Sequence, residues 1–164
     1  MLDDLGYKDK LKAIKLIVFD IDGVLTDGRI YIDHTGNEVK SVSLREIDAV
    51  FSLQRNGYMI GAITGEDTPM TDYFKGRFVW DYFYTGCKNK LDKLKEIEQN
   101  ENISSEQILY IGDGKYDAEV LSYAGIGVCP SDGSEEAKRN ADIILEGRGG
   151  YDCVQELEGM LIIR

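Results

Sequence analysis

The sequence predicts an α/β fold in which helices cover both faces of a parallel sheet. Three observations lead to this prediction. Short apolar runs recur along the chain, segments with helical spacing lie between most of them, and the 164 residues suit one domain with its own core. We find no internal repeat and no linker, so residues 1–164 are expected to form a single domain.

The predicted strands are short apolar runs, which are typical of strands buried on both faces. They are Leu16–Phe19, Met59–Ile63, Tyr82–Tyr84, Ile108–Ile111, Ile126–Val128 and Ile143–Leu145. Helical segments are expected at Ala49–Arg55, Pro69–Arg77, Lys88–Gln99, Asp117–Ala124, Ser134–Asn140 and Tyr151–Met160. Pro69 suits the first turn of its helix, and Ser104 with Gln107 resembles a capping box. This alternation indicates a Rossmann-like sheet.

One segment departs from the alternation. Arg29–Asp33 and Glu38–Ser43 flank a turn that contains His34, and apolar residues alternate at Ile30 and Ile32. This pattern predicts an inserted β-hairpin over about residues 28–43. It follows the first strand, beside the sheet edge where ligands bind in such folds. A flap over an active site and a plain surface hairpin both fit the pattern.

Charge and cysteine content narrow the classes of partner. The formal net charge of −11 disfavours nucleic acids and anionic membranes as partners. Cys87, Cys129 and Cys153 form no C-x-x-C pair, which indicates free thiols in a reducing compartment. The N-terminal residues carry no apolar signal segment, and no run approaches the roughly 20 apolar residues of a membrane span. We expect a cytoplasmic protein.

Two carboxylates, Asp20 and Asp22, directly follow the first predicted strand. In an extended segment, residues two apart face the same side. Such close carboxylates beside a core repel each other and lose hydration unless a cation lies between them. Gly23 would allow the chain to turn sharply afterwards. The alternative is an ordinary acidic turn.

A second acidic pair follows another predicted strand. Asp113 stands at the end of Ile108–Ile111, and Asp117 follows four residues later. The carboxyl ends of parallel strands could bring both acidic segments together and supply oxygen ligands for Mg²⁺. For Asp117, a helix N-cap is an alternative role, and one residue could do both.

Two weaker signals lie between the acidic segments. Thr64 and Gly65 end the second core strand, where a hydroxyl and a backbone N–H could hold phosphate oxygens, although such a pair is usually only a turn. Lys90 lies near a helix N-terminus, where the helix dipole disfavours a cation unless an anion such as phosphate compensates. An ordinary solvated lysine is the alternative.

The order Asp-x-Asp-Gly-x-x-Thr, Thr-Gly, Lys and Gly-Asp-x-x-x-Asp resembles the haloacid dehalogenase superfamily of phosphotransferases, from about Lys15 to Glu158. The resemblance implies an enzyme with a phosphatase mechanism and a HAD-like fold. It implies that Asp20 attacks phosphorus and that Asp22 acts as general acid and base. Thr64 and Lys90 would hold the phosphoryl oxygens.

The resemblance also implies a magnesium site. Its ligands would be Asp20, the backbone carbonyl of Asp22, and Asp113. Asp117 would support the water shell of the metal or Lys90. A cation is needed because a carboxylate that attacks a phosphate brings two anions together.

The segment between Asp22 and the second predicted strand is too short to hold a cap domain. The chain therefore resembles a capless branch of the superfamily. The resemblance is carried by the hairpin and by the segments Asp20–Gly28, Asp33–Glu38 and Gly147–Gly150. That branch includes phosphatases of 3-deoxy-D-manno-octulosonate 8-phosphate and of nonulosonate 9-phosphates, in lipopolysaccharide or sialic acid biosynthesis. It implies a homotetramer in which Arg148 of a neighbouring subunit reaches a substrate carboxylate. A solvated arginine in a flexible loop is the alternative.

The chain departs from this branch at several positions. Gly114 and Lys115 replace the usual second Asp and an apolar residue, and Ala49 stands where Gly is usual. Glu66 occupies a substrate-binding position where the octulosonate enzymes tend to have Arg and some nonulosonate enzymes have Glu. This residue favours the nine-carbon substrate.

Two other functions share part of this pattern. A non-catalytic oligomerisation domain, like those fused to acylneuraminate cytidylyltransferases, is disfavoured by the intact acidic set. A receiver domain of two-component signalling also uses Asp, Thr, Lys and Mg²⁺, but its phosphorylated Asp does not begin an Asp-x-Asp pair as Asp20 does. His34 is interpreted as a turn residue.

Overall fold

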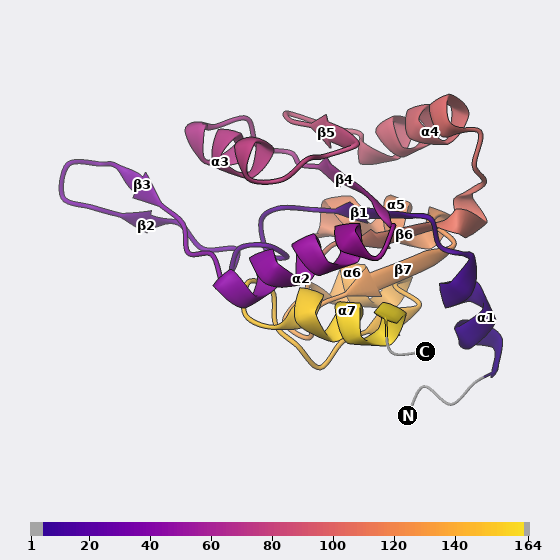
Figure 1. Ribbon diagram of the computed structural model, residues 1–164. Helices are drawn as coiled ribbons and strands as arrows, with labels where there is room; N and C mark the ends of the chain where they lie inside the picture. The colour runs from indigo at the N-terminus through magenta and orange to yellow at the C-terminus, as the bar shows by residue number, and fades with distance from the viewer. Residues whose placement is uncertain (1–4, 163–164) are drawn as a thin grey trace.

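The computed structural model describes residues 5–162, and in this range six parallel strands form one sheet in the order β5-β4-β1-β6-β7-β8 (Figure 1). They are β1 (Leu16–Phe19), β4 (Met59–Ile63), β5 (Tyr82–Tyr84), β6 (Ile108–Ile111), β7 (Ile126–Cys129) and β8 (Ile143–Ile144). Residues 1–4 and 163–164 of the expected domain lie outside the described residues. The predicted α/β fold is confirmed. From β1 the strand order runs in one direction through β4 and β5 and in the other through β6, β7 and β8, so the switch point, where such sheets bind ligands, lies between β1 and β6.

Helices cover both faces of the sheet because side chains alternate along the buried strands. On β1, Ile17 and Phe19 join one core, and Leu16 and Val18 join the other. The first core packs against α1 (Leu5–Ala13), α2 (Leu44–Arg55), α3 (Pro69–Arg77) and α7 (Cys153–Ile162). The second packs against α4 (Lys90–Glu101), α5 (Ala118–Tyr123) and α6 (Glu135–Asn140). Figure 1 shows α2 and α7 side by side on the near face.

Helix α2 begins at Leu44, five residues before the predicted start at Ala49. The residues before Ala49 look like a polar loop in the sequence. One of them, Glu46, is nevertheless fully buried in the first turn of the helix. Its carboxylate accepts hydrogen bonds from the backbone N–H groups of Val154 (3.1 Å) and Gln155 (2.9 Å) in the first turn of α7. A buried acid is tolerated there because it satisfies helix N–H groups that otherwise lack partners.

Other boundaries follow local chemistry. The predicted capping box precedes the 3₁₀ turn η1 (Ser105–Gln107), where the backbone N–H of Ser104 donates to the side chain of Gln107 at 3.2 Å. Pro69 opens α3 as predicted. Helix α1 was not predicted, and β8 ends one residue before Leu145. A second 3₁₀ turn, η2, spans Lys115–Asp117.

The predicted hairpin is confirmed, with strands β2 (Tyr31–Ile32) and β3 (Glu38–Val39) that project from the body of the protein (Figure 1). The paired strands are shorter than predicted, and their residues are exposed on both faces. At the base, Thr26 forms an antiparallel bridge with Val42. The turn between the strands contains His34, as expected.

All three cysteines are free thiols, as the sequence indicated. Cys129 and Cys153 are buried, and Cys87 is half-buried. Across residues 5–162, helices long and apolar enough to cross a bilayer are absent.

Two glycines allow the loop after β1 to pack tightly between distant segments. Gly23 has a positive φ of 85°, and a Cβ at this position would overlap the carboxylate of Asp113. A Cβ at Gly149 would overlap the carbonyl of Gly23 from the other side. The nearby backbone N–H of Gly150 donates to the carbonyl of Val24 at 2.7 Å. The C-terminal glycine loop thus supports the loop that follows Asp20.

We therefore predict that Gly149→Ala destabilises the protein by about 1–3 kcal/mol, because the added methyl group must displace backbone atoms. Gly76→Ala is the matched control, since it adds the same methyl group within α3, where nothing beyond the local helix backbone lies within 4 Å. That control should be neutral or stabilise by up to about 1 kcal/mol. Urea unfolding measures both. Equal stability of Gly149→Ala and wild type would contradict the described packing.

Candidate active site

The register of two neighbouring strands brings the acidic segments together. Phe19, the last residue of β1, pairs with Ile111, the last residue of β6. The next residue, Asp20, donates its backbone N–H to the carbonyl of Ile111 at 2.9 Å. Asp113 follows β6 after a single glycine. Both carboxylates therefore lie at the carboxyl edge of the sheet, at its switch point.

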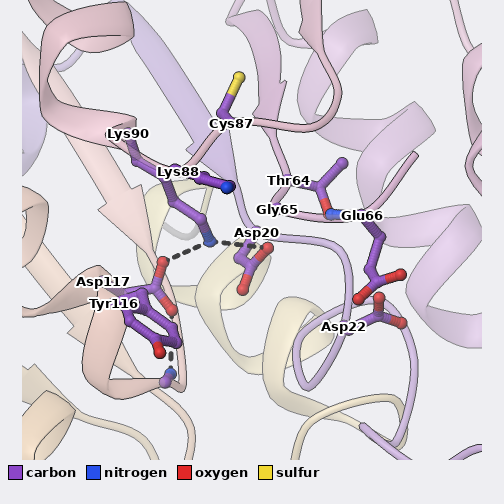
Figure 2. Close-up of a pocket in the computed structure, with 11 residues that line it drawn as sticks. Asp20, Asp22, Thr64, Gly65, Glu66, Cys87, Lys88, Lys90, Tyr116 and Asp117 are labelled. Atoms are coloured by element: carbon purple, nitrogen blue, oxygen red, sulfur yellow. Dashed lines mark hydrogen bonds and ion pairs between the residues drawn. The ribbon is translucent and has the colours of Figure 1, made fainter.

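A pocket of about 480 Å³ opens at this edge, a volume within the range of small-molecule sites. Its lining combines acidic, cationic and hydroxyl groups from several strand ends (Figure 2): Asp20, Asp22, Thr64, Gly65, Glu66, Cys87, Lys88, Lys90, Gly114, Tyr116 and Asp117. Most residues singled out in the sequence are thus brought together. Arg148 does not line this pocket; it pairs with Asp132 at 3.3 Å and lies over the ring of Tyr151.

Lys90 is the central cation of the site. Its Nζ lies 3.0 Å from Oδ1 of Asp20 and 2.7 Å from Oδ1 of Asp117, and the side chain is almost fully buried (Figure 2). Lys90 is the first residue of α4, where the helix dipole opposes it. Burial lowers the pKa of Lys90, but the two carboxylates outweigh that effect and raise it above its ordinary value. The lysine is therefore held as a cation.

Asp117 is fixed by two more donors. The hydroxyl of Tyr110 donates to Oδ1 at 2.6 Å, and the backbone N–H of Gly114 donates to Oδ2 at 2.9 Å. Tyr110 was not singled out in the sequence because it lies inside an apolar strand run. Its hydroxyl was the available signal, since a buried tyrosine O–H usually finds a partner. The carboxylate of Asp117 is thereby fixed beside Lys90.

Three carboxylates share the charge of this lysine. Asp20, Asp113 and Asp117 each offer an oxygen within 4.8 Å of the others. Burial, followed by repulsion from Asp117, raises the pKa of Asp20 well above its ordinary value and that of Asp113 to about 7. One lysine cannot compensate all three groups. An oxygen-rich cluster with excess negative charge fits a hard divalent cation such as Mg²⁺.

Asp20 is oriented with one oxygen occupied and one available. Its Oδ1 accepts the backbone N–H of Ile21 at 2.8 Å in addition to the contact with Lys90. Its Oδ2 accepts no hydrogen bond from any residue that the structure describes. The buried carboxylate therefore presents one oxygen to a ligand in the pocket.

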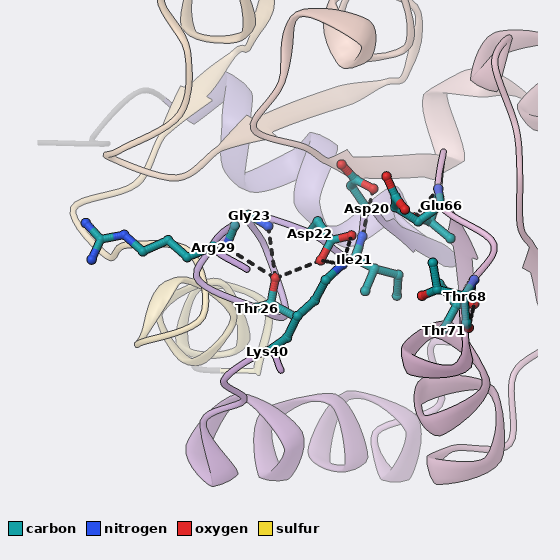
Figure 3. Close-up of polar contacts among 12 residues, drawn as sticks. Asp20, Ile21, Asp22, Gly23, Thr26, Arg29, Lys40, Glu66, Thr68 and Thr71 are labelled. Atoms are coloured by element: carbon teal, nitrogen blue, oxygen red, sulfur yellow. Dashed lines mark hydrogen bonds and ion pairs between the residues drawn. The ribbon is translucent and has the colours of Figure 1, made fainter. Parts of the chain in front are cut away.

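Asp22 lies apart from this carboxylate cluster. Its side chain is bound by the hydroxyl of Thr26, the last residue of the Asp-x-Asp-Gly-x-x-Thr motif, and by Lys40, which the sequence analysis did not single out (Figure 3). Lys40 gave no signal because it lies in a hairpin in which most other side chains are exposed. For Asp22 the expected metal ligand is the backbone carbonyl, so this side-chain position does not conflict with that expectation.

Thr64 and Glu66 form the opposite side of the pocket. Thr64 directly follows β4 in a buried position, and its hydroxyl accepts the backbone N–H of Glu66 at 3.3 Å. Figure 2 shows the Glu66 carboxylate directed towards Asp22. A hydroxyl, a glycine backbone and a carboxylate therefore face Asp20 across a small space.

Comparison with known proteins agrees with this geometry. Residues 70–148 match the family model of haloacid dehalogenase-like hydrolases. The chain is 27% identical over 154 residues to the 3-deoxy-D-manno-octulosonate 8-phosphate phosphatase of Escherichia coli K12. This alignment covers 94% of this chain and 82% of the relative. The corresponding Haemophilus influenzae enzyme is 26% identical over 155 residues, or 94% and 86% of the two chains.

Residues 70–148 are thus similar to haloacid dehalogenase-like hydrolases, and most of the chain is similar to octulosonate 8-phosphate phosphatases. A similar solved structure is the octulosonate 8-phosphate phosphatase of Moraxella catarrhalis in complex with magnesium, phosphate and a KDO molecule. Its TM-score is 0.90 at 27% identity, with 96% of this chain and 91% of that chain covered. The cobalt-bound Haemophilus influenzae enzyme gives a TM-score of 0.87 at 26% identity, covering 94% and 90%.

The raised pKa of Asp113 leads to a testable link between metal binding and pH. Because this pKa is about 7 instead of 3.8, the contribution of Asp113 to stability is fully present below about pH 4 and is lost as the pH rises through about 7. A bound divalent cation would oppose that loss, since it requires the carboxylate.

We predict that Mg²⁺ raises the melting temperature, and that the increase is larger at about pH 8 than at about pH 6. At 100-fold excess over its Kd, the stabilisation is expected to be about 2.7 kcal/mol. Asp113→Asn should lose most of the increase, and exposed Asp9→Asn should keep it. An increase of the same size in Asp113→Asn would contradict the assignment of this cluster as the metal site.

Proposed function

We propose that the protein is a magnesium-dependent phosphatase that acts on a sugar-acid phosphate through an aspartyl-phosphate intermediate. The observation that carries this proposal is the meeting of Asp20, Lys90 and Asp117 in one pocket at the switch point, with the carboxylate of Asp113 close to those of Asp20 and Asp117. A nucleophile, a fixed cation and a metal site are what attack by a carboxylate on phosphorus requires. The named relatives support the same class of reaction.

Asp20 is the proposed nucleophile. Its Oδ1 is held by Lys90 and the backbone of Ile21, which leaves Oδ2 to attack the phosphorus atom. The new O–P bond forms as the bond from phosphorus to the sugar oxygen breaks. Lys90 and Thr64 would hold the phosphoryl oxygens. Mg²⁺ bound by Asp20, Asp113 and the carbonyl of Asp22 would reduce the repulsion between the carboxylate and the phosphate.

Asp22 is the proposed general acid and base. In the first step its carboxyl group donates a proton to the departing sugar oxygen, which becomes a hydroxyl. In the second step the resulting carboxylate accepts a proton from water as that water attacks phosphorus. The O–P bond to Asp20 then breaks, which releases phosphate and regenerates the nucleophile. The position of Asp22 in the pocket lining supports this role.

The proposed substrate is an eight- or nine-carbon sugar acid phosphorylated at its far end. The relatives support octulosonate 8-phosphate, whereas Glu66 in the pocket lining favours a nonulosonate 9-phosphate. A carboxylate would hydrogen-bond sugar hydroxyls but repel an anionic group. The substrate carboxylate would therefore lie away from Glu66, at a cation such as Arg148 from a second subunit. The pathway would be lipopolysaccharide or sialic acid biosynthesis.

A cytoplasmic homotetramer is part of this proposal. The hairpin exposes four apolar side chains, which is unusual for a free surface in water: Ile30, Tyr31, Ile32 and Val39. Contact between subunits would cover them and could bring Arg148 to a neighbouring pocket. The free thiols of Cys129 and Cys153 suit a reducing compartment. Light scattering after size-exclusion chromatography measures the assembly directly.

We predict Mg²⁺-dependent phosphate release with a strong preference for one member of a panel that includes octulosonate 8-phosphate and nonulosonate 9-phosphates. Asp20→Asn should reduce kcat by at least about 10⁴-fold, because an amide cannot act as the nucleophile. The fold should be retained, since the side-chain volume is unchanged. The exposed Asp48→Asn is the matched control and should keep full activity.

Full activity in Asp20→Asn would disprove the mechanism. Absence of phosphate release from the whole panel, with an intact fold and bound Mg²⁺, would favour the non-catalytic oligomerisation domain instead.

A further inference from the structure

Lys40 makes the closest contact between the hairpin and the pocket. Its Nζ lies 2.7 Å from Oδ1 and 2.7 Å from Oδ2 of Asp22 (Figure 3). The lysine side chain is only 7% exposed, although it comes from a segment whose other side chains face solvent. A long cationic side chain loses rotamer freedom when it is buried in this way. Its burial therefore needs a compensating contact, and Asp22 is that contact.

The two oxygens of Asp22 are not equivalent. Oδ1 accepts from Lys40 and also from the hydroxyl of Thr26 at 3.1 Å, whereas Oδ2 accepts only from Lys40 among the described residues. Thr26 is itself fixed, because its hydroxyl accepts the backbone N–H groups of Gly23 and Gly28. These contacts fix the plane of the carboxyl group. They leave Oδ2 as the oxygen with room for a proton.

We propose that Lys40 is a positioning residue that holds Asp22 for proton transfer to the leaving group. This assignment rests on the proposed phosphatase function. An ammonium group has three hydrogens, so Lys40 can keep its contact with Oδ1 when Oδ2 carries the proton. Lys40 itself neither gains nor loses a proton in the step. Its effect is geometric, and a displacement of about 1 Å in a reacting group can reduce the rate about 100-fold.

The location of Lys40 makes this contact a link between the hairpin and the reaction. Lys40 directly follows β3, and two residues later Val42 pairs with Thr26 at the hairpin base. Lys40 and Thr26, the two partners of Asp22, therefore belong to the two segments that pair at the base of the hairpin. A displacement of this base would move the proton donor while Asp20 stayed fixed by Lys90.

Leaving-group chemistry distinguishes positioning of a proton donor from a general structural role. A sugar alkoxide must be protonated as it leaves, whereas p-nitrophenolate leaves without protonation. The ratio kcat/KM reports the steps up to and including the first irreversible one, which is the departure of the leaving group. We therefore compare kcat/KM for the best sugar phosphate and for p-nitrophenyl phosphate, with Mg²⁺ present.

Lys40→Met should lower kcat/KM about 10- to 100-fold for the sugar phosphate and less than about 3-fold for p-nitrophenyl phosphate. Lys40→Arg should recover part of the loss, since arginine also binds a carboxylate through two hydrogen bonds. Arg29→Met is the matched control, because Arg29 is an exposed cation near the same hairpin and its side chain points away from Asp22 (Figure 3). Its kcat/KM should be unchanged for both esters. If Lys40→Met does not fold, Lys40→Gln replaces it.

Equal losses on both esters, or no loss on either, would overturn the positioning role of Lys40 and leave the proposed function intact. A wild-type protein that hydrolyses neither ester would instead overturn the proposed function, and this assignment with it. Asp20→Asn must be inactive on both esters, which confirms that both are cleaved at the same site.

Discussion

Burial of three carboxylates around one lysine is the constraint on which the site depends. Asp20, Asp113 and Asp117 are held close together at the carboxyl edge of the sheet, and Lys90 contacts two of them. Like charges at this separation in a buried site are unfavourable unless cations compensate them. The raised pKa of Asp113 is a direct consequence, and so is the fit to a divalent cation.

The rest of the fold supplies the close packing that makes this crowding possible. Gly23 lets the loop after β1 approach Asp113, and the C-terminal glycine loop closes over the same loop from the other side. Helix α7 follows that loop, and the buried Glu46 of α2 binds its first turn. The segment after the hairpin and the C-terminus are therefore both tied to the loop that carries Asp20 and Asp22.

Sequence reasoning succeeded where chemistry follows from position along the chain. The positions of Asp20 and Asp113 at strand ends predicted that they could meet at the carboxyl edge of the sheet, and the apolar runs predicted the six sheet strands almost to the residue. It failed where a side chain acts far from its own element. Tyr110 was hidden in an apolar strand, Glu46 in a polar stretch, and Lys40 in an exposed hairpin. Long-range contacts of this kind leave no periodic pattern.

The most direct test of the account is detection of phosphate on Asp20. The enzyme is mixed with Mg²⁺ and its preferred sugar phosphate, quenched in acid during turnover, digested, and examined by mass spectrometry. The account predicts that the peptide containing Asp20 gains the mass of one phosphoryl group, and that borohydride converts this residue to homoserine. Continued turnover with the phosphoryl group on another residue, or on none, would contradict it.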